Sequence, residues 1–229
     1  AHGNQVTRSG KSRVPIMLTK FPCALLFAAT TASLTAAASL PPTPIEQAPL
    51  PHSAVVVFDI DGTLTPHNLF VHEARPGAAE VVNSYAARGY QVIYVSTRVP
   101  LFQSGLTAWL HKHGFAPGPV HVAQNSAERR DPVGFKAAIL QGYQQAGWTL
   151  SYAYGDSATD FSAYERAGIA PQRVFALKRR FSRHCQPGVY RTCLDGWGAH
   201  LTFVEHEVPL QATLQKAAGA ARTPVGPVH

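Results

Sequence analysis

Asp59 and Asp61 stand one residue apart at the end of the apolar run Val55–Phe58, and Gly-Thr-Leu-Thr follows them. Residues two apart in a strand face the same side, so both carboxylates would project together from the end of a core strand. Asp-Gly between apolar runs also fits a hairpin turn. However, a turn needs no second aspartate, and the segment after Gly62 makes a poor return strand.

This carboxylate pair suits phosphate chemistry. Attack on a phosphate monoester needs a carboxylate nucleophile, a cation that offsets the charge, and a proton donor for the leaving oxygen. Asp59 and Asp61 can supply two of these functions, and a metal can supply the third. The pattern therefore predicts metal-assisted phosphoryl transfer.

The segment Val55–Thr65 resembles the first motif of the haloacid dehalogenase-like (HAD) superfamily phosphatases, an apolar strand followed by Asp-x-Asp-Gly-Thr. The resemblance implies that Asp59 is the nucleophile and forms an aspartyl-phosphate. It also implies that Asp61 protonates the leaving oxygen and later activates water. The expected activity is that of a phosphoric monoester hydrolase.

Three further motifs of this superfamily follow in the expected order. The strand-like run Gln91–Ser96 ends in hydroxyls, Lys136 begins a helix-like segment, and Gly-Asp-x-x-x-Asp contains Asp156 and Asp160. By resemblance, the substrate-binding residues are Ser96 or Thr97, Arg98 and Lys136, and the metal ligands are Asp59, Asp61, Asp156 and Asp160. Taken singly, each motif also fits a strand end, a solvated helix face or a helix cap. Their joint order favours the catalytic interpretation.

The charges of the four aspartates favour a bound cation. Each pair of carboxylates about 4 to 6 Å apart would cost roughly 3 to 4 kcal/mol at an effective dielectric constant near 20. All the expected ligands are oxygens, with no cysteine or histidine pair at zinc spacing nearby. This donor set favours Mg²⁺ as the cofactor.

Apolar strands and amphipathic helices alternate between the motifs. This predicts an α/β, Rossmann-like parallel sheet with helices on both faces and the site at the strand carboxyl ends. The expected strands lie near residues 54–58, 91–96, 119–123, 152–155 and 173–177. The expected helices lie near residues 77–88, 101–113, 134–146 and 160–168.

The spacing between motifs leaves no room for a sizeable cap domain. Residues 66–90 hold one expected helix, and residues 97–135 hold a helix, a strand and a loop. An uncapped site is open to a large phosphorylated substrate, a membrane lipid or a protein, although an oligomeric partner could also cover it. The sequence leaves the oligomeric state open.

A narrower resemblance covers four segments of the chain, His72–Val81, Gly89–Arg98, Ala153–Ile169 and Arg173–Leu177. They look like the catalytic domain of lipins, the phosphatidate phosphatases, although this chain has Asp156 where lipins carry Asn and lacks the long amino-terminal lipin region. The resemblance implies a phospholipid substrate such as phosphatidate. Two alternatives stay open: a phosphatase for a soluble phosphate ester or phosphoprotein, and a non-catalytic lipid-phosphate binding module.

The amino-terminal part reads as a secretory signal. Met17 and Lys20 precede an apolar run that ends in small residues at 36–38, and the alternative is an uncleaved membrane anchor. We expect an extension and signal at 1–38, a Pro-rich linker at 39–53, the phosphatase domain at 54–205 and a tail at 206–229. The protein would then be secreted or periplasmic.

Charge and cysteine content fit an exported enzyme. The first 38 residues hold four of the 20 basic side chains and none of the 13 acidic ones, so the formal charge falls from +7 to +3 without them. The basic residues Lys178, Arg179, Arg180 and Arg183 could face anionic phosphate or a lipid surface, or could form a solvated loop. Outside the first 38 residues the chain has two cysteines, Cys185 and Cys193. They predict one disulfide, with a metal pair as the minor alternative. Nothing in the sequence favours nucleic-acid binding.

Overall fold

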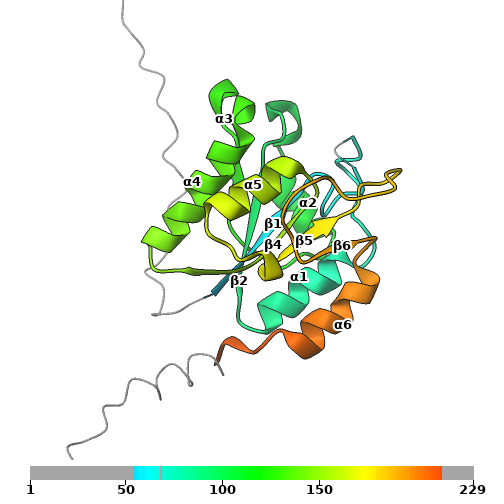
Figure 1. The fold of residues 1–229 in the computed structure, drawn as a ribbon. Coiled ribbons are helices and arrows are strands. Elements are labelled where there is room, and N and C mark those ends of the chain that lie inside the picture. The colour runs from blue at the N-terminus through cyan, green and yellow to red at the C-terminus, as the bar shows by residue number, and fades with distance from the viewer. Residues whose placement is uncertain (1–53, 68, 213–229) are drawn as a thin grey trace, which may run out of the picture. The chain divides into compact units, whose positions relative to one another are not determined.

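The computed structural model describes residues 54–67 and 69–212. Within these residues, six strands form one parallel sheet in the order β3-β2-β1-β4-β5-β6 (Figure 1). The strands are β1 (Ala54–Asp59), β2 (Gln91–Ser96), β3 (Val120–Val122), β4 (Thr149–Gly155), β5 (Val174–Leu177) and β6 (Thr192–Leu194). The predicted parallel α/β fold is therefore confirmed.

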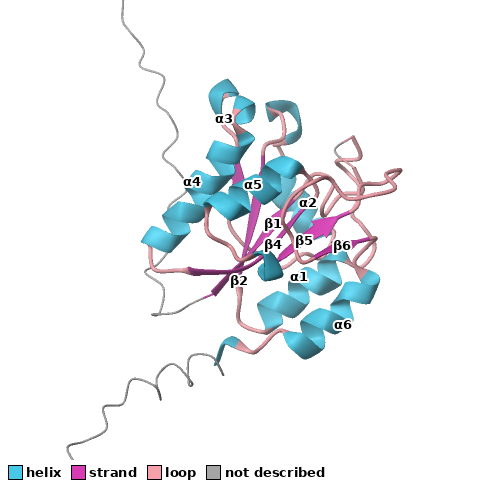
Figure 2. Cartoon of the chain, viewed as in Figure 1, coloured by secondary structure: helices cyan, strands magenta, loops and turns pink. Residues whose placement is uncertain are grey.

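Helices cover both faces of the sheet (Figure 2). The α-helices are α1 (Ala78–Ala87), α2 (Leu106–Lys112), α3 (Ser126–Arg130), α4 (Pro132–Gln145), α5 (Ala158–Arg166) and α6 (Gly198–Glu207). Side chains from α1, α2 and α6 enter one hydrophobic core, whereas those from α4 and α5 enter the other. Two short 3₁₀ turns, η1 (Pro100–Phe102) and η2 (Pro171–Arg173), complete the described elements.

The central strand β1 is apolar because it is buried on both sides. Val56 and Phe58 enter the core that α1 and α6 cover, while Val55 and Val57 enter the core that α4 and α5 cover. All four side chains are fully buried. Burying each of them contributes about 1.5 to 3 kcal/mol, so this strand is fixed firmly at the centre of the sheet.

Strand register brings the ends of β1, β2 and β4 to the same edge. Asp59 pairs with Val95, the residue before Ser96, and Phe58 pairs with Tyr154. Asp156 follows β4 directly. The carboxyl edge of the sheet therefore collects the polar residues that the motifs supply, as expected for an open α/β sheet.

Some elements differ from the predicted ones. The helix expected at 101–113 divides into η1 and α2, because Gly105 adopts a left-handed φ of 77° before α2 begins. The elements α3, β6 and α6 were not predicted; α3 and β6 have only five and three residues. Helix α6 runs to Glu207 and Val208 is buried, so the packed domain extends past the expected boundary at 205.

In the part of the chain that the structure describes, only α1 lies between β1 and β2, and only η1 and α2 lie between β2 and β3. Neither connection holds a cap domain. The expected signal (1–38), the linker (39–53) and residues 213–229 of the tail lie outside the described residues. Among the helices that are described, none combines the length and the apolar character needed to cross a membrane.

Candidate active site

A tight turn follows Asp59, the last residue of β1. The backbone N–H groups of Leu64 and Thr65 donate to the carbonyl of Ile60 at 2.9 and 3.0 Å. Gly62 has a φ of +86°, and a Cβ atom there would lie 2.0 Å from a carboxylate oxygen of Asp156. Glycine therefore meets two needs at this position, a left-handed backbone and close approach to the second acidic motif.

Asp59 is held in one orientation by two donors. Lys136 Nζ lies 2.5 Å from Oδ1 of Asp59, and the hydroxyl of Thr63 donates to Oδ2 at 2.9 Å. Burial raises the pKa of Asp59 well above its usual value, and Asp160 adds to this, while Lys136 acts in the opposite direction. A buried carboxylate beside a fixed cation is the arrangement expected of a positioned nucleophile.

Lys136 joins the first and last motifs. Its Nζ atom also lies 2.5 Å from Oδ1 of Asp160, and the side chain is almost fully buried in α4. Burial opposes the charged form, but the neighbouring Asp160 and Asp59 carboxylates together raise the pKa of Lys136 above its usual value. This lysine is therefore a permanent cation inside the site.

Asp156 and Asp160 are positioned by the start of α5. Ser157 is the N-cap of this helix and forms a capping box with Asp160. Oδ2 of Asp160 accepts from the backbone N–H groups of Asp156 and Ser157 at 3.1 and 3.0 Å. Burial, together with the charge of Asp160, raises the pKa of Asp156 to about 6. These local bonds fix the orientation of the second acidic motif at the start of α5.

Carboxylate oxygens of Asp59, Asp156 and Asp160 all lie within 4.8 Å of one another. All three side chains are buried. Three converging carboxylates offer the hard oxygen ligands that Mg²⁺ prefers. The residues present therefore fit this cofactor.

The structure does not bring Asp61 into this carboxylate cluster, in contrast to its expected place among the metal ligands. The expectation assumed that the alternation of a strand continues past Asp59. Instead β1 ends at Asp59 and the chain turns between Ile60 and Thr65, so the turn and not the strand sets the direction of Asp61.

Asp61 binds to the end of β2 instead. Arg98 donates to both of its carboxylate oxygens, at 2.7 and 3.1 Å, and the hydroxyl of Ser96 donates to Oδ2 at 2.6 Å. Ser96 also accepts from the backbone N–H of Arg98 at 3.0 Å. In this structure Ser96 and Arg98 therefore position Asp61. Thr97 lies half-buried between them.

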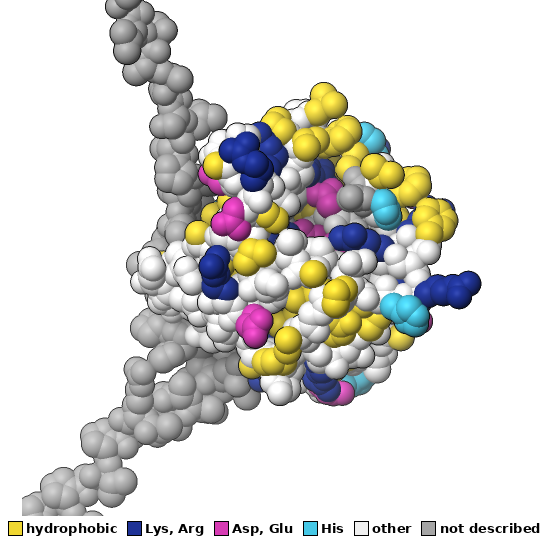
Figure 3. Space-filling view, turned by 45° about the horizontal axis from the view of Figure 1, so that its top comes forward, with side chains coloured by type: hydrophobic (Ala, Val, Ile, Leu, Met, Phe, Trp, Pro, Cys, Tyr) yellow, Lys and Arg dark blue, Asp and Glu magenta, His cyan; other side chains and the backbone are white. Residues whose placement is uncertain are grey.

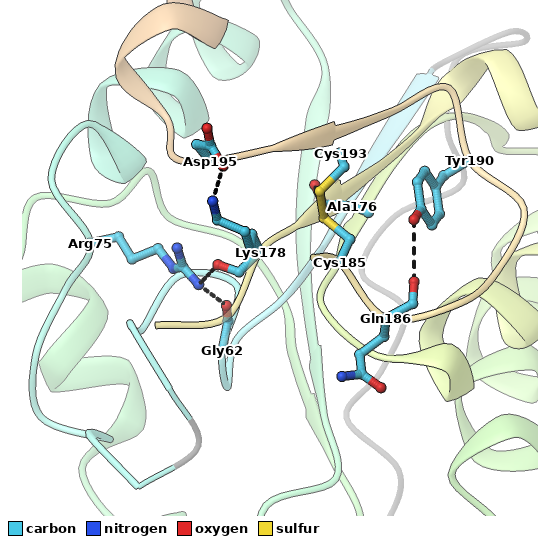
Figure 4. Close-up of a disulfide and its surroundings, with 9 residues drawn as sticks. All are labelled: Gly62, Arg75, Ala176, Lys178, Cys185, Gln186, Tyr190, Cys193 and Asp195. Carbon is cyan, nitrogen blue, oxygen red and sulfur yellow. Dashed lines mark hydrogen bonds and ion pairs between the residues drawn. A yellow bond between two sulfur atoms is a disulfide. The ribbon is translucent and has the colours of Figure 1, made fainter. Parts of the chain in front are cut away.

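Arg75 and Arg179 are site residues that the sequence reasoning missed. Arg179 forms an ion pair with the buried carboxylate of Asp156, although the sequence favours a surface position for the basic run that contains it. The Arg75 guanidinium donates to the carbonyls of Gly62 at 2.6 Å and Lys178 at 2.8 Å (Figure 4). For Arg75, the sequence signal was the Arg-Pro-Gly segment at residues 75–77, which ends directly before α1.

The predicted bond between Cys185 and Cys193 is present (Figure 4). Cys193 lies in β6, and Cys185 lies in the loop that joins β5 to β6. The bond therefore ties the middle of this loop to the edge of the sheet. The same loop begins with Lys178, which pairs with Asp195, and Arg179, which pairs with Asp156 of the acidic cluster.

Sequence comparison identifies relatives of this domain. The family model of the LNS2 domain of PITM 1-3 matches residues 56–178. Protein retinal degeneration B of Drosophila melanogaster is 30% identical over 159 residues, which cover 68% of this chain and 12% of that protein. Human membrane-associated phosphatidylinositol transfer protein 1 is 29% identical over 184 residues, which cover 74% of this chain and 14% of that protein. The chain thus spans only a small part of these relatives.

Comparison with solved structures confirms the fold. D,D-heptose 1,7-bisphosphate phosphatase of B. bronchiseptica, solved with magnesium and phosphate, superposes with a TM-score of 0.52 at 16% identity. The match covers 68% of this chain and 99% of the phosphatase. The domain has the fold of the HAD-like phosphatases and, because the family model covers more than half of the sequence, the chain belongs to the LNS2 domain family of PITM 1-3.

Proposed function

We propose that this domain is a Mg²⁺-dependent phosphomonoesterase that works through an aspartyl-phosphate and acts on a phospholipid such as phosphatidate. One observation carries the proposal. Asp59 lies at the carboxyl edge of the sheet with its carboxylate held by Lys136 and Thr63, within a cluster completed by Asp156 and Asp160. A purely structural aspartate would not need two further buried carboxylates beside it.

In the first half-reaction, a carboxylate oxygen of Asp59 attacks phosphorus, and the bond from phosphorus to the ester oxygen breaks. Lys136 keeps the attacking carboxylate in place and offsets charge on the transferring group. Asp61 gives a proton to the leaving alkoxide. In the second half-reaction, Asp61 takes a proton from water as the water attacks phosphorus, which releases inorganic phosphate and restores Asp59.

Arg98 and Ser96 set the geometry of Asp61 for these proton transfers. The Arg98 guanidinium and the Ser96 hydroxyl hold the Asp61 carboxylate as a hydrogen-bond acceptor, which is its role toward water in the second half-reaction. To donate a proton in the first half-reaction, Asp61 must first gain one. We therefore propose that substrate phosphate draws the Arg98 guanidinium away from Asp61, which gives Arg98 its expected substrate-binding role as well.

Asp59, Asp156 and Asp160 would hold the Mg²⁺ ion. When bound, the ion offsets the negative charge of the phosphate dianion and of the three carboxylates. The raised pKa values of Asp59 and Asp156 have the same two main causes, burial and the charge of the neighbouring Asp160. Both shifts support the proposal of a cation at this position.

A lipid substrate is supported by the open edge and by the relatives. The described connections after β1 and β2 contain no cap domain that would enclose a small molecule. The human relative is named as a membrane-associated phosphatidylinositol transfer protein. The disulfide between Cys185 and Cys193 supports the further proposal that the protein works outside the cytoplasm.

A second candidate is a non-catalytic module that binds lipid phosphate. The names of the relatives favour it, because they describe lipid transfer rather than hydrolysis. The two candidates differ in what Asp59 does. Hydrolysis requires its carboxylate as a nucleophile, whereas binding of an anion would be improved by removing a negative charge at this position.

Phosphate release decides between them. Wild-type protein is assayed with phosphatidate, glycerol phosphate, a nucleotide and a phosphopeptide, with Mg²⁺ and with a chelator. We expect Mg²⁺-dependent release that is highest with phosphatidate and is abolished in Asp59→Asn. Asp195→Asn is the matched control, because this carboxylate is 85% exposed and outside the cluster. Full activity of Asp59→Asn, or binding of phosphatidate without release by wild type, would contradict the proposal.

The leaving-group dependence of Asp61→Asn tests the proton-transfer role. We expect turnover of an alkyl phosphate to fall by about 10² to 10⁴, the usual range for loss of a general acid or base. With p-nitrophenyl phosphate, whose leaving group needs no proton, the first step should survive. The variant should then release one equivalent of nitrophenol in a burst and stall as the aspartyl-phosphate. Equal losses with both esters and no burst would remove Asp61 from the acid role.

A further inference from the structure

Three large apolar side chains are strongly exposed beside the candidate active site. Leu69 is 79% exposed, Leu101 is 77% exposed and Phe181 is 82% exposed. We call these three residues the apolar tips. Val99 and Phe102 are also exposed next to Leu101. In Figure 3, hydrophobic side chains gather along the upper right of the molecule, next to acidic side chains.

The segments that carry the apolar tips follow β1 and the strands on both sides of the β1–β4 pair. Leu69 lies in the loop after β1, Leu101 in the turn η1 that follows β2, and Phe181 in the loop after β5. In the sheet, β2 lies on one side of the β1–β4 pair and β5 lies on the other. The strands that carry Asp59 and Asp156 are therefore between the strands whose loops carry Leu101 and Phe181.

Two of the loops that carry the tips are attached to site residues. Arg98, which binds Asp61, also donates from its guanidinium to the carbonyl of Phe102 at 3.1 Å. On the other side, Arg179 binds Asp156, and Arg180 stacks over the rings of Phe70 and Phe181. The tips are thus extensions of the same loops that build the site.

The backbone at Phe181 is unusual. Its φ of 69° makes it the one non-glycine residue with a positive φ among the described residues. A bulky side chain in this conformation is a strained arrangement that the surrounding contacts must maintain. Arg180 supplies two of them, since its N–H donates to the carbonyl of Pro66 at 3.0 Å and its guanidinium pairs with Glu73. The fold therefore maintains an exposed phenylalanine at some cost in stability.

The basic residues beside the tips are mostly paired. Lys178 binds Asp195, Arg179 binds Asp156 and Arg180 binds Glu73, which leaves Arg183 as the member of this run without an acidic partner among the described residues. The sequence left open whether this basic run faces an anionic surface or forms a solvated loop. The pairing weakens that electrostatic contact and leaves the apolar tips as the larger source of attraction.

We propose that the apolar tips insert into a lipid bilayer around the headgroup whose phosphate enters the site. This inference rests on the proposed function and names the surface through which it acts. A protein interface has an apolar centre and a polar rim. Here the order is reversed, with a charged centre and apolar tips around it. This arrangement suits a phosphate headgroup at the centre and hydrocarbon beneath the rim.

Flotation with phosphatidylcholine vesicles that contain phosphatidate tests the proposal. The full chain is compared with the triple variant Leu69→Ser, Leu101→Ser, Phe181→Asn, in which Asn suits the left-handed backbone. Removing one exposed tip should weaken partitioning about tenfold, so the triple variant should lose on the order of a thousandfold if the three tips act independently. Leu210→Ser is the matched control. Leu210 is 50% exposed, and its neighbour Gln211 binds Arg88 near the start of β2, at the opposite edge of the sheet.

A tryptophan reporter measures insertion directly, even if another part of the chain also holds the protein on vesicles. Leu101→Trp should gain emission that brominated lipids quench, whereas Leu210→Trp should not. Unchanged flotation of the triple variant together with no quenching at position 101 would overturn the proposal. Loss of self-association in the triple variant, with vesicle binding intact, would show a protein contact and would also overturn it.

Soluble substrate separates this proposal from the proposed function. If both are right, the triple variant hydrolyses p-nitrophenyl phosphate within about twofold of wild type but loses turnover of phosphatidate in vesicles. If wild type hydrolyses nothing and the tips still govern vesicle binding, the catalytic proposal fails and the bilayer surface stands. If hydrolysis in vesicles is high and independent of the tips, the bilayer surface fails and the catalytic proposal stands.

Discussion

Lys136 Nζ lies 2.5 Å from a carboxylate oxygen of Asp59 and equally close to one of Asp160. This ammonium group is the shared counter-ion of two buried carboxylates, one at the end of β1 and the other in α5. The contact therefore links stability to catalysis. The same positive charge that compensates the carboxylates in the folded protein holds the proposed nucleophile in position.

We predict that Lys136→Met destabilises the protein by about 3 to 5 kcal/mol, because it leaves two buried carboxylates without their common partner. Mg²⁺ should restore part of this loss by supplying positive charge at the same cluster. Urea unfolding with and without Mg²⁺ measures both effects. Lys178→Met is the control and should change stability by no more than about 1 kcal/mol, since its partner Asp195 is exposed. A Lys136→Met protein as stable as wild type without Mg²⁺ would contradict the prediction.

A second prediction concerns the ion pair between Arg179 and Asp156. The guanidinium competes with a metal ion for this carboxylate, so Arg179→Gln should strengthen Mg²⁺ binding by up to about fivefold, as expected for a partly exposed pair. The Mg²⁺ dependence of the melting temperature measures the affinity. Arg180→Gln is the control, because Arg180 pairs with Glu73 instead. Weaker Mg²⁺ binding in Arg179→Gln would show that Arg179 orients Asp156 for the metal.

The sequence alone could predict the sheet and most of the carboxylate cluster. Val55–Phe58 is apolar without alternation, which indicates a strand buried on both faces, and the polar residues follow directly. Parallel strands place their carboxyl ends at one edge, and the resemblance to the HAD-like phosphatases implied that Asp59 and Asp156 meet there. Lys136 followed from its order among the motifs.

The sequence could not predict the orientation of Asp61 or the partner of Arg179. Asp61 depends on the turn after β1, where backbone bonds to Ile60 replace the alternation of a strand. Arg179 depends on how the loop after β5 crosses the edge of the sheet, and its partner is 23 residues away in the sequence. Short elements such as β6 have too few residues for a periodic pattern. Each of these features is fixed by packing between distant segments.

The bond between Cys185 and Cys193 gives a third prediction. Replacing both residues by serine should lower the free energy of unfolding by roughly 2 to 3 kcal/mol, because the unfolded chain is no longer constrained by this short loop. Chemical denaturation of the variant and of wild type, each without reductant, measures the difference. Peptide mapping of exported protein without reductant should also find the two cysteines linked. Free thiols at both positions, or equal stabilities, would contradict the prediction.

The last prediction concerns His200, which lies in α6 and is buried among aromatic rings. Its Nε2 atom lies 2.8 Å from the hydroxyl of Tyr154. Burial, with a smaller contribution from Arg191, lowers the pKa of His200 from 6.5 to about 4. Below pH 6.5 the unfolded chain therefore binds a proton that the folded protein does not. Stability should fall from pH 6.5 to about 4, by up to about 3 kcal/mol in total.

Asp156 acts in the opposite direction over part of this range, because its raised pKa of about 6 makes the metal-free folded protein take up a proton as the pH falls. The contribution of His200 must therefore be isolated by comparison with His200→Gln. As the pH falls from 6.5 to 4, the unfolding free energy of wild type should decrease relative to that of His200→Gln. A difference that is constant over this range, or an imidazole NMR signal of His200 that titrates near 6.5, would show that the ring is accessible to protons in the folded state.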